Sequence, residues 1–148
     1  MGYLERGECV DVRVKAERAL WNYRDNVKKV KELRQLLDLL MSVHGQNYGA
    51  AHVVNGVFDP VGDVVHKVLA LERKIAGTEK AIRAVDSLID SLVLNVRELD
   101  VWQMLGILEC RYMEHKNPYK VMRELGITKG TYYRRNNELI GRAEEYLS

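Results

Sequence analysis

Residues 117–140, NPYKVMRELGITKGTYYRRNNELI, combine basic, hydroxyl and aromatic side chains with the local signals of two successive helices. Asn117-Pro118 is typical of a helix start, Gly126 suits the left-handed position after a helix end, and Thr128 suits the cap of a second helix. A short helix, a turn of about three residues and a longer helix form the helix-turn-helix layout. In that layout, residues near the start of the second helix reach base edges in the major groove of DNA.

The helical period separates a buried face of these two helices from an open one. The residues assigned to the buried face are Val121, Met122, Leu125, Ile127, Tyr132, Leu139 and Ile140. Lys129, Thr131 and Arg134 remain on the open side, near the start of the second helix. An arginine can contact guanine through two hydrogen bonds, and a threonine methyl group can touch the methyl group of thymine. We therefore predict base contacts for these three residues.

Contacts with phosphates supply much of the affinity for DNA and make it depend on salt. The residues predicted to make them are Lys120, Arg123, Thr128, Tyr133 and Arg135. Residues 111–135 hold seven Lys or Arg against two Glu, an excess of +5 in a chain whose net charge is only +2. The alternative is a helical packing module with a solvated basic face, in which Tyr133 is an ordinary surface aromatic residue.

The first two thirds of the chain have the pattern of two long helices. Apolar residues recur at spacings of three and four in residues 9–43 and again in residues 60–94. Asp59-Pro60 is a favourable start for the second helix. The glycine-containing residues 44–59 are predicted to connect the two helices into an antiparallel hairpin.

The apolar seam of the second long helix is predicted to mediate self-association. Its members are Val64, Val68, Leu71, Ile75, Ile82, Val85 and Ile89. Two helices alone bury little surface, so a second copy is the favoured partner, and the alternative is that the seam only closes the hairpin within one chain. The predicted organisation is an oligomerisation hairpin over residues 1–95 and a DNA-binding domain over residues 96–148, which opens with a helix at about 98–114.

The composition favours an all-α fold, because 47% of the 148 residues are apolar and only two are proline. Cys9, Cys110 and the four histidines show no metal-ligand spacing, and the sequence contains no nucleophile motif or glycine-rich phosphate loop. No apolar run approaches the roughly 20 residues that span a bilayer. We therefore expect a cytoplasmic protein that is not an enzyme, with no metal, no cofactor and no membrane partner.

The segment from about residue 98 to residue 147, which contains ILECRYMEHKNPYKVMRELGITKGTYYRRNNELI, resembles the C-terminal helix-turn-helix of region four of bacterial sigma factors. It resembles still more the small phage regulators of the RinA/ArpU type, which activate late, packaging and lysis genes in phages of Gram-positive bacteria. GVFDPVGDVVHKVLALERKI resembles the coiled segment that precedes this domain in related phage proteins. The resemblance therefore covers about residues 55–147.

The resemblance implies that Lys129, Thr131 and Arg134 read bases and that Tyr133 lies near the DNA backbone. Gly130 departs from the sigma pattern, which usually has an acidic or polar residue there, so the sequence preference is expected to differ. No region that would melt promoter DNA is visible, so a complete sigma factor is not expected.

These patterns together predict a sequence-specific transcriptional regulator, an activator of phage late or packaging genes in the cytoplasm of the bacterial host. Double-stranded DNA and a second copy of the chain are the expected partners, and RNA polymerase is a candidate partner. One alternative is the small terminase subunit of a phage packaging motor, which also pairs a helix-turn-helix with an oligomerising hairpin. The other is a helical adaptor that binds protein and has no affinity for DNA.

Overall fold

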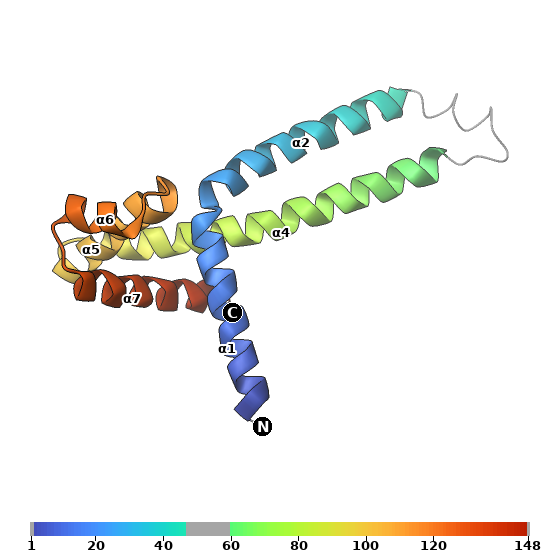
Figure 1. Ribbon diagram of the computed structural model, residues 1–148. Coiled ribbons are helices and arrows are strands. Elements are labelled where there is room, and N and C mark those ends of the chain that lie inside the picture. Colours follow the sequence, from blue (N-terminus) through green and yellow to red (C-terminus); the bar gives the residue numbers. More distant parts are fainter. Residues whose placement is uncertain (1, 47–59, 148) are drawn as a thin grey trace. The chain divides into compact units, whose positions relative to one another are not determined.

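The structure, a computed structural model, describes residues 2–46 and 60–147. These residues are helical apart from short turns, and none of them forms a strand, so the predicted all-α class is confirmed. In chain order the elements are α1 (Gly2–Trp21), α2 (Tyr23–Gln46), α4 (Pro60–Leu94), α5 (Leu99–Ile107), the π-helical segment η1 (Leu108–Met113), α6 (Pro118–Leu125) and α7 (Lys129–Leu147) (Figure 1).

The helix bounds agree with the sequence where the local capping signals are strong. α4 begins at Pro60 and ends at Leu94, α6 spans Pro118–Leu125, and α7 ends at Leu147, as predicted. The helix expected over residues 98–114 begins at Leu99, but its last six residues form η1. π-Helical turns are rare and appear mostly as single turns within α-helices, and the apolar pattern does not reveal them.

The prediction of one N-terminal helix over residues 9–43 is wrong, because the chain is divided at Asn22 into α1 and α2. Trp21, the last residue of α1, stacks on His115 with ring centroids 3.9 Å apart. Arg24 donates a hydrogen bond to the carbonyl oxygen of Met113 at 3.1 Å. These contacts with distant residues fix the chain at the break, where asparagine itself has a low helix propensity.

Two compact units divide the chain differently from the boundary predicted at residue 95. The terminal unit consists of residues 1–25 and 81–148, and the middle unit consists of residues 26–80. Within the terminal unit α1 packs against α7, and Leu20 of α1 belongs to the same buried core as Leu88 of α4 and Tyr132 of α7. The core beneath α7 therefore includes a helix from the other end of the chain.

The middle unit contains most of α2 and the first part of α4, which run alongside each other (Figure 1). Val30 of α2 and Ile75 of α4 are buried, and Arg34 forms an ion pair with Glu79 across the two helices. This ion pair joins the two helices of the middle unit. α2 extends to Gln46, and the rest of the connector predicted for residues 44–59 lies outside the described residues.

The apolar seam of α4 is covered, fully or in part, within the chain. Ile75 and Val85 are buried. The half-buried members of the seam are Val64, Val68, Leu71, Ile82 and Ile89. The seam thus contributes to packing inside one chain, which is the alternative that the sequence left open, and its role in self-association stays a prediction.

Candidate nucleic-acid interface

Local sequence fixes α6 at both of its ends. Asn117 Oδ1 accepts a hydrogen bond from the Lys120 amide at 2.9 Å, and Pro118 stands at the helix start, where its missing amide hydrogen costs nothing. Gly126 ends the helix with a φ of 65°, in the left-handed region where a Cβ is unfavourable. The helix so defined presents Lys120 and Arg123 to solvent.

Thr128 caps the start of α7, as predicted. Its Oγ1 accepts a hydrogen bond from the Thr131 amide at 3.3 Å and donates one to Thr131 Oγ1 at 3.0 Å. A phosphate oxygen can accept a hydrogen bond but cannot donate one. The hydroxyl of Thr128 can therefore reach the DNA backbone only by giving up its bond to Thr131, whereas the hydroxyl of Thr131 keeps its own hydrogen to donate.

α7 has a buried face and an outer face. The residues of the buried face are Tyr132, Leu139, Ile140 and Ala143. On the opposite side, the helical period aligns Gly130, Arg134, Asn137 and Gly141, which we call the outer stripe. Tyr133 is exposed beside it and Thr131 is half-buried at its edge. Two of the three predicted base-reading residues, Thr131 and Arg134, therefore lie on or next to the outer stripe, whereas Lys129 is exposed at the helix start, three residues before the buried Tyr132.

Asn137 belongs to the outer stripe, although the sequence reasoning did not single it out. It lies one turn beyond Arg134, it is exposed, and its Oδ1 accepts a hydrogen bond from Arg13 of α1 at 2.7 Å. An asparagine amide offers one donor group and one acceptor, the pair that matches the major-groove edge of adenine. The helical period continued for three residues past Arg134 would have identified this position.

Arg135 has a different role from the one predicted for it. Its guanidinium group lies 2.9 Å from Asp100 Oδ1 and 3.0 Å from Glu138 Oε1, and its Nε donates to Gln103 Oε1 at 2.9 Å. Only 12% of its side chain is exposed. These bonds join α5 to α7 and occupy the donors that a phosphate would need, so we leave Arg135 out of the DNA contacts proposed below.

Replacing Arg135 by Met, which has a similar length and no charge, is expected to lower the free energy of unfolding by about 1–2 kcal/mol. The reason is that Asp100, Gln103 and Glu138 lose a shared partner. Urea denaturation followed by circular dichroism measures the change. The matched variant Arg134→Met removes an exposed arginine next in sequence and should stay within about 0.5 kcal/mol of the unmodified chain. Equal losses in the two variants would contradict the structural role of Arg135.

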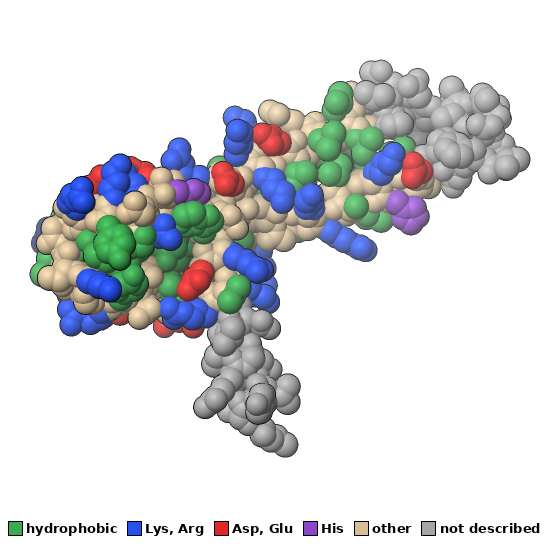
Figure 2. Space-filling model, in the orientation of Figure 1, with side chains coloured by type: hydrophobic (Ala, Val, Ile, Leu, Met, Phe, Trp, Pro, Cys, Tyr) green, Lys and Arg blue, Asp and Glu red, His purple; other side chains and the backbone are tan. Residues whose placement is uncertain are grey.

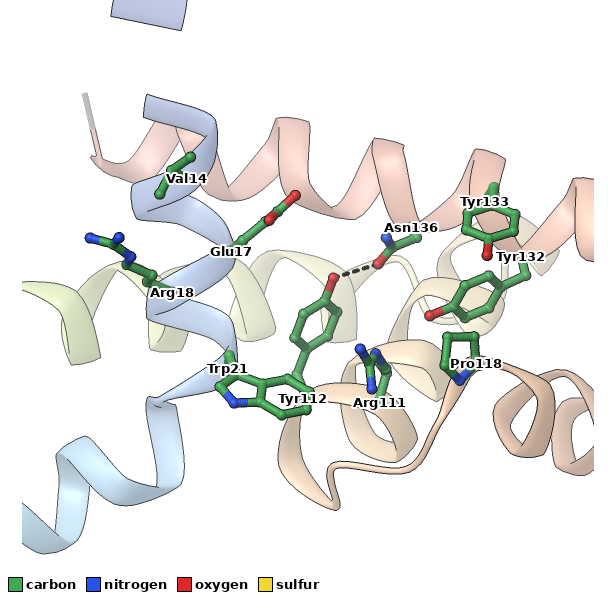
Figure 3. Close-up of a pocket in the computed structure, with 10 residues that line it drawn as sticks. All are labelled: Val14, Glu17, Arg18, Trp21, Arg111, Tyr112, Pro118, Tyr132, Tyr133 and Asn136. Carbon is green, nitrogen blue, oxygen red and sulfur yellow. Dashed lines mark hydrogen bonds between the residues drawn. The ribbon is translucent and has the colours of Figure 1, made fainter. Parts of the chain in front are cut away.

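A cavity of about 450 Å³ lies in the terminal unit between α1, η1, the start of α6 and α7 (Figure 3). Arg111 lies over the ring of Trp21, 4.7 Å from its centroid, and donates a hydrogen bond to the Lys116 carbonyl oxygen at 2.9 Å. The hydroxyl of Tyr112 donates to Asn136 Oδ1 at 2.6 Å. Burial raises the pKa of Tyr112 to about 12, so this hydroxyl stays protonated at neutral pH.

The side chains around this cavity bond mainly to one another. Arg111 already places a cation against Trp21, and Glu17, which lines the opposite wall, forms an ion pair with Arg13 at 3.5 Å. The lining thus carries two arginines, Arg18 and Arg111, and one carboxylate, that of Glu17. Its residues also connect three elements. Trp21 of α1 packs edge-to-face against Tyr112 of η1, which is hydrogen-bonded to Asn136 in the first half of α7.

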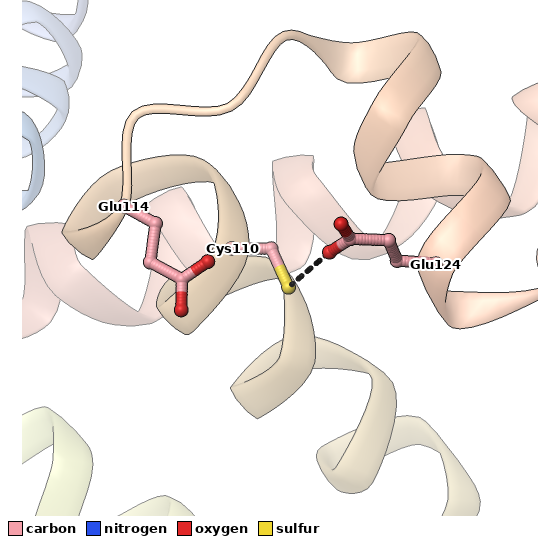
Figure 4. A group of neighbouring side chains, drawn as sticks. All are labelled: Cys110, Glu114 and Glu124. Atoms are coloured by element: carbon pink, nitrogen blue, oxygen red, sulfur yellow. Dashed lines mark hydrogen bonds between the residues drawn. The ribbon is translucent and has the colours of Figure 1, made fainter.

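Cys110, Glu114 and Glu124 offer three potential metal ligands close together (Figure 4). Both carboxylates already form ion pairs with the ammonium group of Lys116, whose Nζ lies 2.6 Å from Glu114 and 2.7 Å from Glu124. Hydrogen bonding to Lys116 lowers the pKa of Glu124, and burial raises the pKa of the Cys110 thiol. A protonated thiol is a poor metal ligand. The cluster is therefore explained as an ion network that joins η1 to α6.

Exposed cations gather on α6 and α7. They are Lys120, Arg123, Lys129 and Arg134. Two carboxylates of the same helices, Glu124 and Glu138, are already paired with other cations of the terminal unit. In Figure 2, Lys and Arg side chains lie around a group of hydrophobic side chains over the part of the molecule that holds α6 and α7. This surface suits a polyanion more than a neutral partner.

Comparison of the chain with protein-family models, with curated proteins and with solved structures finds no match. Among the described helices, none is both long and apolar enough to cross a membrane.

Proposed function

We propose that the chain is a sequence-specific DNA-binding regulator in which α7 enters the major groove as the recognition helix of a helix-turn-helix. The observation that carries this proposal is the outer stripe of α7. It stands opposite the buried face of the helix, and the preceding helix α6 carries two exposed cations, Lys120 and Arg123. Residues near the start of a recognition helix are those that reach base edges.

Within this proposal, the first half of α7 reads bases. Arg134 donates two hydrogen bonds to guanine, and the methyl group of Thr131 contacts thymine. Asn137 pairs with the edge of adenine when its Oδ1 exchanges the hydrogen bond from Arg13 for one from the base. Lys129, at the first position of the helix, reaches a base edge from the helix start. Gly130 places no side chain on the outer stripe, so the helix backbone can approach the floor of the groove closely.

Phosphate contacts position the helix in the groove. Lys120 and Arg123 on α6 supply charge, and the hydroxyl of Tyr133 donates to a phosphate beside α7. Thr128 contributes mainly as the cap that sets the start of the helix, because its hydroxyl is bonded to Thr131. Affinity should then fall steeply as salt rises, and base contacts should determine which site is preferred.

The resemblance over residues 55–147 supports a finer proposal about the biological role. Small phage regulators with a sigma-like helix-turn-helix activate late and packaging genes, and we propose the same class of role here. The site of action would then be the cytoplasm of the bacterial host, and RNA polymerase would be a further partner.

The salt dependence of binding to a fluorescent duplex tests whether α6 lies on the phosphates. Lys120→Gln and Arg123→Gln should each reduce the slope of log affinity against log salt by about 1. Arg73→Gln and Lys74→Gln are matched controls, because they remove the same charge from exposed positions of the middle unit. The same slope in all four variants would contradict the placement of α6, and no binding even at low salt would contradict the proposed function.

The substitution Gly130→Glu is expected to change the affinity for DNA without lowering the stability of the fold. A Cβ at Gly130 meets nothing within 4 Å, and a carboxylate in the first turn of a helix is favoured by the helix dipole, so the stability of the variant should be unchanged or higher. Against the preferred site of this chain, the added side chain fills the space that Gly130 leaves on the outer stripe. The sigma pattern usually has an acidic or polar residue here, but this chain is expected to prefer a different sequence, and we expect an affinity loss for that sequence of at least about tenfold, or about 1.4 kcal/mol.

Gly77→Glu is the matched control for this prediction. It adds the same side chain and charge to α4, at another helical glycine with nothing within 4 Å of its Cβ. Its affinity for DNA, measured by fluorescence anisotropy, should equal that of the unmodified chain. Unchanged binding by Gly130→Glu would show that the outer stripe does not face DNA.

A further inference from the structure

The junction between α4 and α5 exposes an unusual concentration of apolar side chains. Within residues 93–102, which we call the α4–α5 corner, the exposed apolar residues are Val93, Leu94, Val96, Leu99 and Trp102. Leu94 is 85% exposed, Leu99 66% and Trp102 51%. Isolated exposed apolar residues are ordinary, whereas a group of them marks an interaction surface.

The fold does not require apolar residues on the outside of this corner. Leu92 and Val101, on the inner side, are fully buried and anchor the corner to the core. The backbone turns through its own hydrogen bonds, from the Asn95 amide to the Leu92 carbonyl oxygen at 3.1 Å and from the Glu98 amide to the Asn95 carbonyl oxygen at 3.1 Å. Polar side chains would serve equally well on the outer side, so the apolar ones suit a partner.

The charges of the corner indicate which kind of partner fits. Arg97 and Glu98 are adjacent, exposed and of opposite sign, and the carboxylate of Asp100 is held by Arg135. Such a surface is neutral overall and carries both members of an ion pair. A polyanion would gain nothing from it, whereas a second copy turned about a twofold axis would set each Arg97 against the Glu98 of the other copy.

We propose that two copies of this chain associate through the α4–α5 corner. Leu94, Leu99 and Trp102 form the apolar centre of the interface, and Arg97 and Glu98 pair across it twice. Tryptophan in the centre of an interface commonly contributes a large share of the binding energy. The seam of α4 is already used in part within the chain, because Ile75 and Val85 are buried.

The position of the corner has a consequence for DNA binding, which rests on the proposed function. The corner and α7 belong to the same compact unit, so a dimer through the corner would hold two copies of α7 in a fixed relation. A twofold dimer of this kind fits a DNA site made of two inverted half-sites.

Sedimentation velocity of the full chain without DNA, over a wide range of protein concentration, tests the proposal. The unmodified chain should sediment as a dimer that dissociates to monomer on dilution. The double variant Leu94→Gln/Leu99→Gln should weaken self-association by at least about tenfold. Leu36→Gln/Leu39→Gln is the control, because it makes the same changes at exposed leucines of α2 and should leave the dimer unaffected. Circular dichroism verifies that every variant is folded.

A charge exchange tests the twofold arrangement itself. Arg97→Glu and Glu98→Arg, taken singly, should each weaken the dimer, and the two together should restore it because the pairs are rebuilt with reversed polarity. A chain that stays monomeric, assembles into a ring of many subunits, or dimerises equally well after Leu94→Gln/Leu99→Gln would overturn the proposal. So would a double exchange that fails to restore the dimer. Since no DNA is present, none of these outcomes bears on the role of α7.

Discussion

Arg134→Ala is expected to lower the affinity for the preferred DNA site by roughly 5- to 150-fold, the equivalent of about 1–3 kcal/mol for one bidentate contact with guanine. Its affinity for a scrambled duplex at the same salt should fall far less, because only one charge has been lost from the phosphate-facing surface. Arg134 is exposed, so its replacement should change the free energy of unfolding little. Fluorescence anisotropy with the two duplexes measures both affinities and hence their ratio.

Arg73→Ala is the control for this experiment. It removes the same side chain from an exposed position of α4 in the middle unit, and both affinities should remain near those of the unmodified chain. If Arg134→Ala weakened binding to both duplexes by the same factor, Arg134 would be a phosphate contact, and the assignment of the outer stripe to base recognition would be wrong.

Leu20→Ala is expected to reduce the free energy of unfolding of the terminal unit by about 2–5 kcal/mol. Leu20 is fully buried and belongs to the core that also contains Tyr132 and Leu139 of α7. Removing its isopropyl group takes away buried apolar area and leaves a cavity between α1 and the C-terminal helices. Urea denaturation followed by circular dichroism gives the change.

Leu36→Ala provides the comparison for this loss. Leu36 is an exposed leucine of α2, and its truncation should alter stability by no more than about 0.5 kcal/mol. A negligible effect of Leu20→Ala would mean that α1 does not pack on the C-terminal helices. The domain that is proposed to bind DNA would then begin at residue 96, as the sequence alone indicated.

The helices that the sequence located most accurately are those whose ends depend on adjacent residues. Asn117 caps α6 through the Lys120 amide, Gly126 ends it, and Thr128 caps α7. Each of these signals acts within three or four residues of chain, so it can be read without knowledge of the tertiary structure. The buried face of α7 was predicted for the same reason, because a helical period is a local property.

Features that depend on distant contacts could not be predicted in this way. The break at Asn22 is stabilised by the stacking of Trp21 on His115. No local signal in the sequence indicates that these two residues meet. Arg135 looks like its neighbour Arg134 in the sequence, and only the approach of Asp100 from α5 distinguishes the two. The seam of α4 was compatible with either an internal or an intermolecular partner, and its period alone could not choose between them.

Selection of binding sites from a pool of random-sequence duplexes is the most direct test of the claim that α7 reads DNA. The full chain should enrich one motif, its affinity for that motif should fall steeply between low and physiological salt, and Arg134→Ala should lose the enrichment. Binding that retains every sequence equally, or no binding at either salt, would contradict the account and would leave α6 and α7 as packing helices with a solvated basic face.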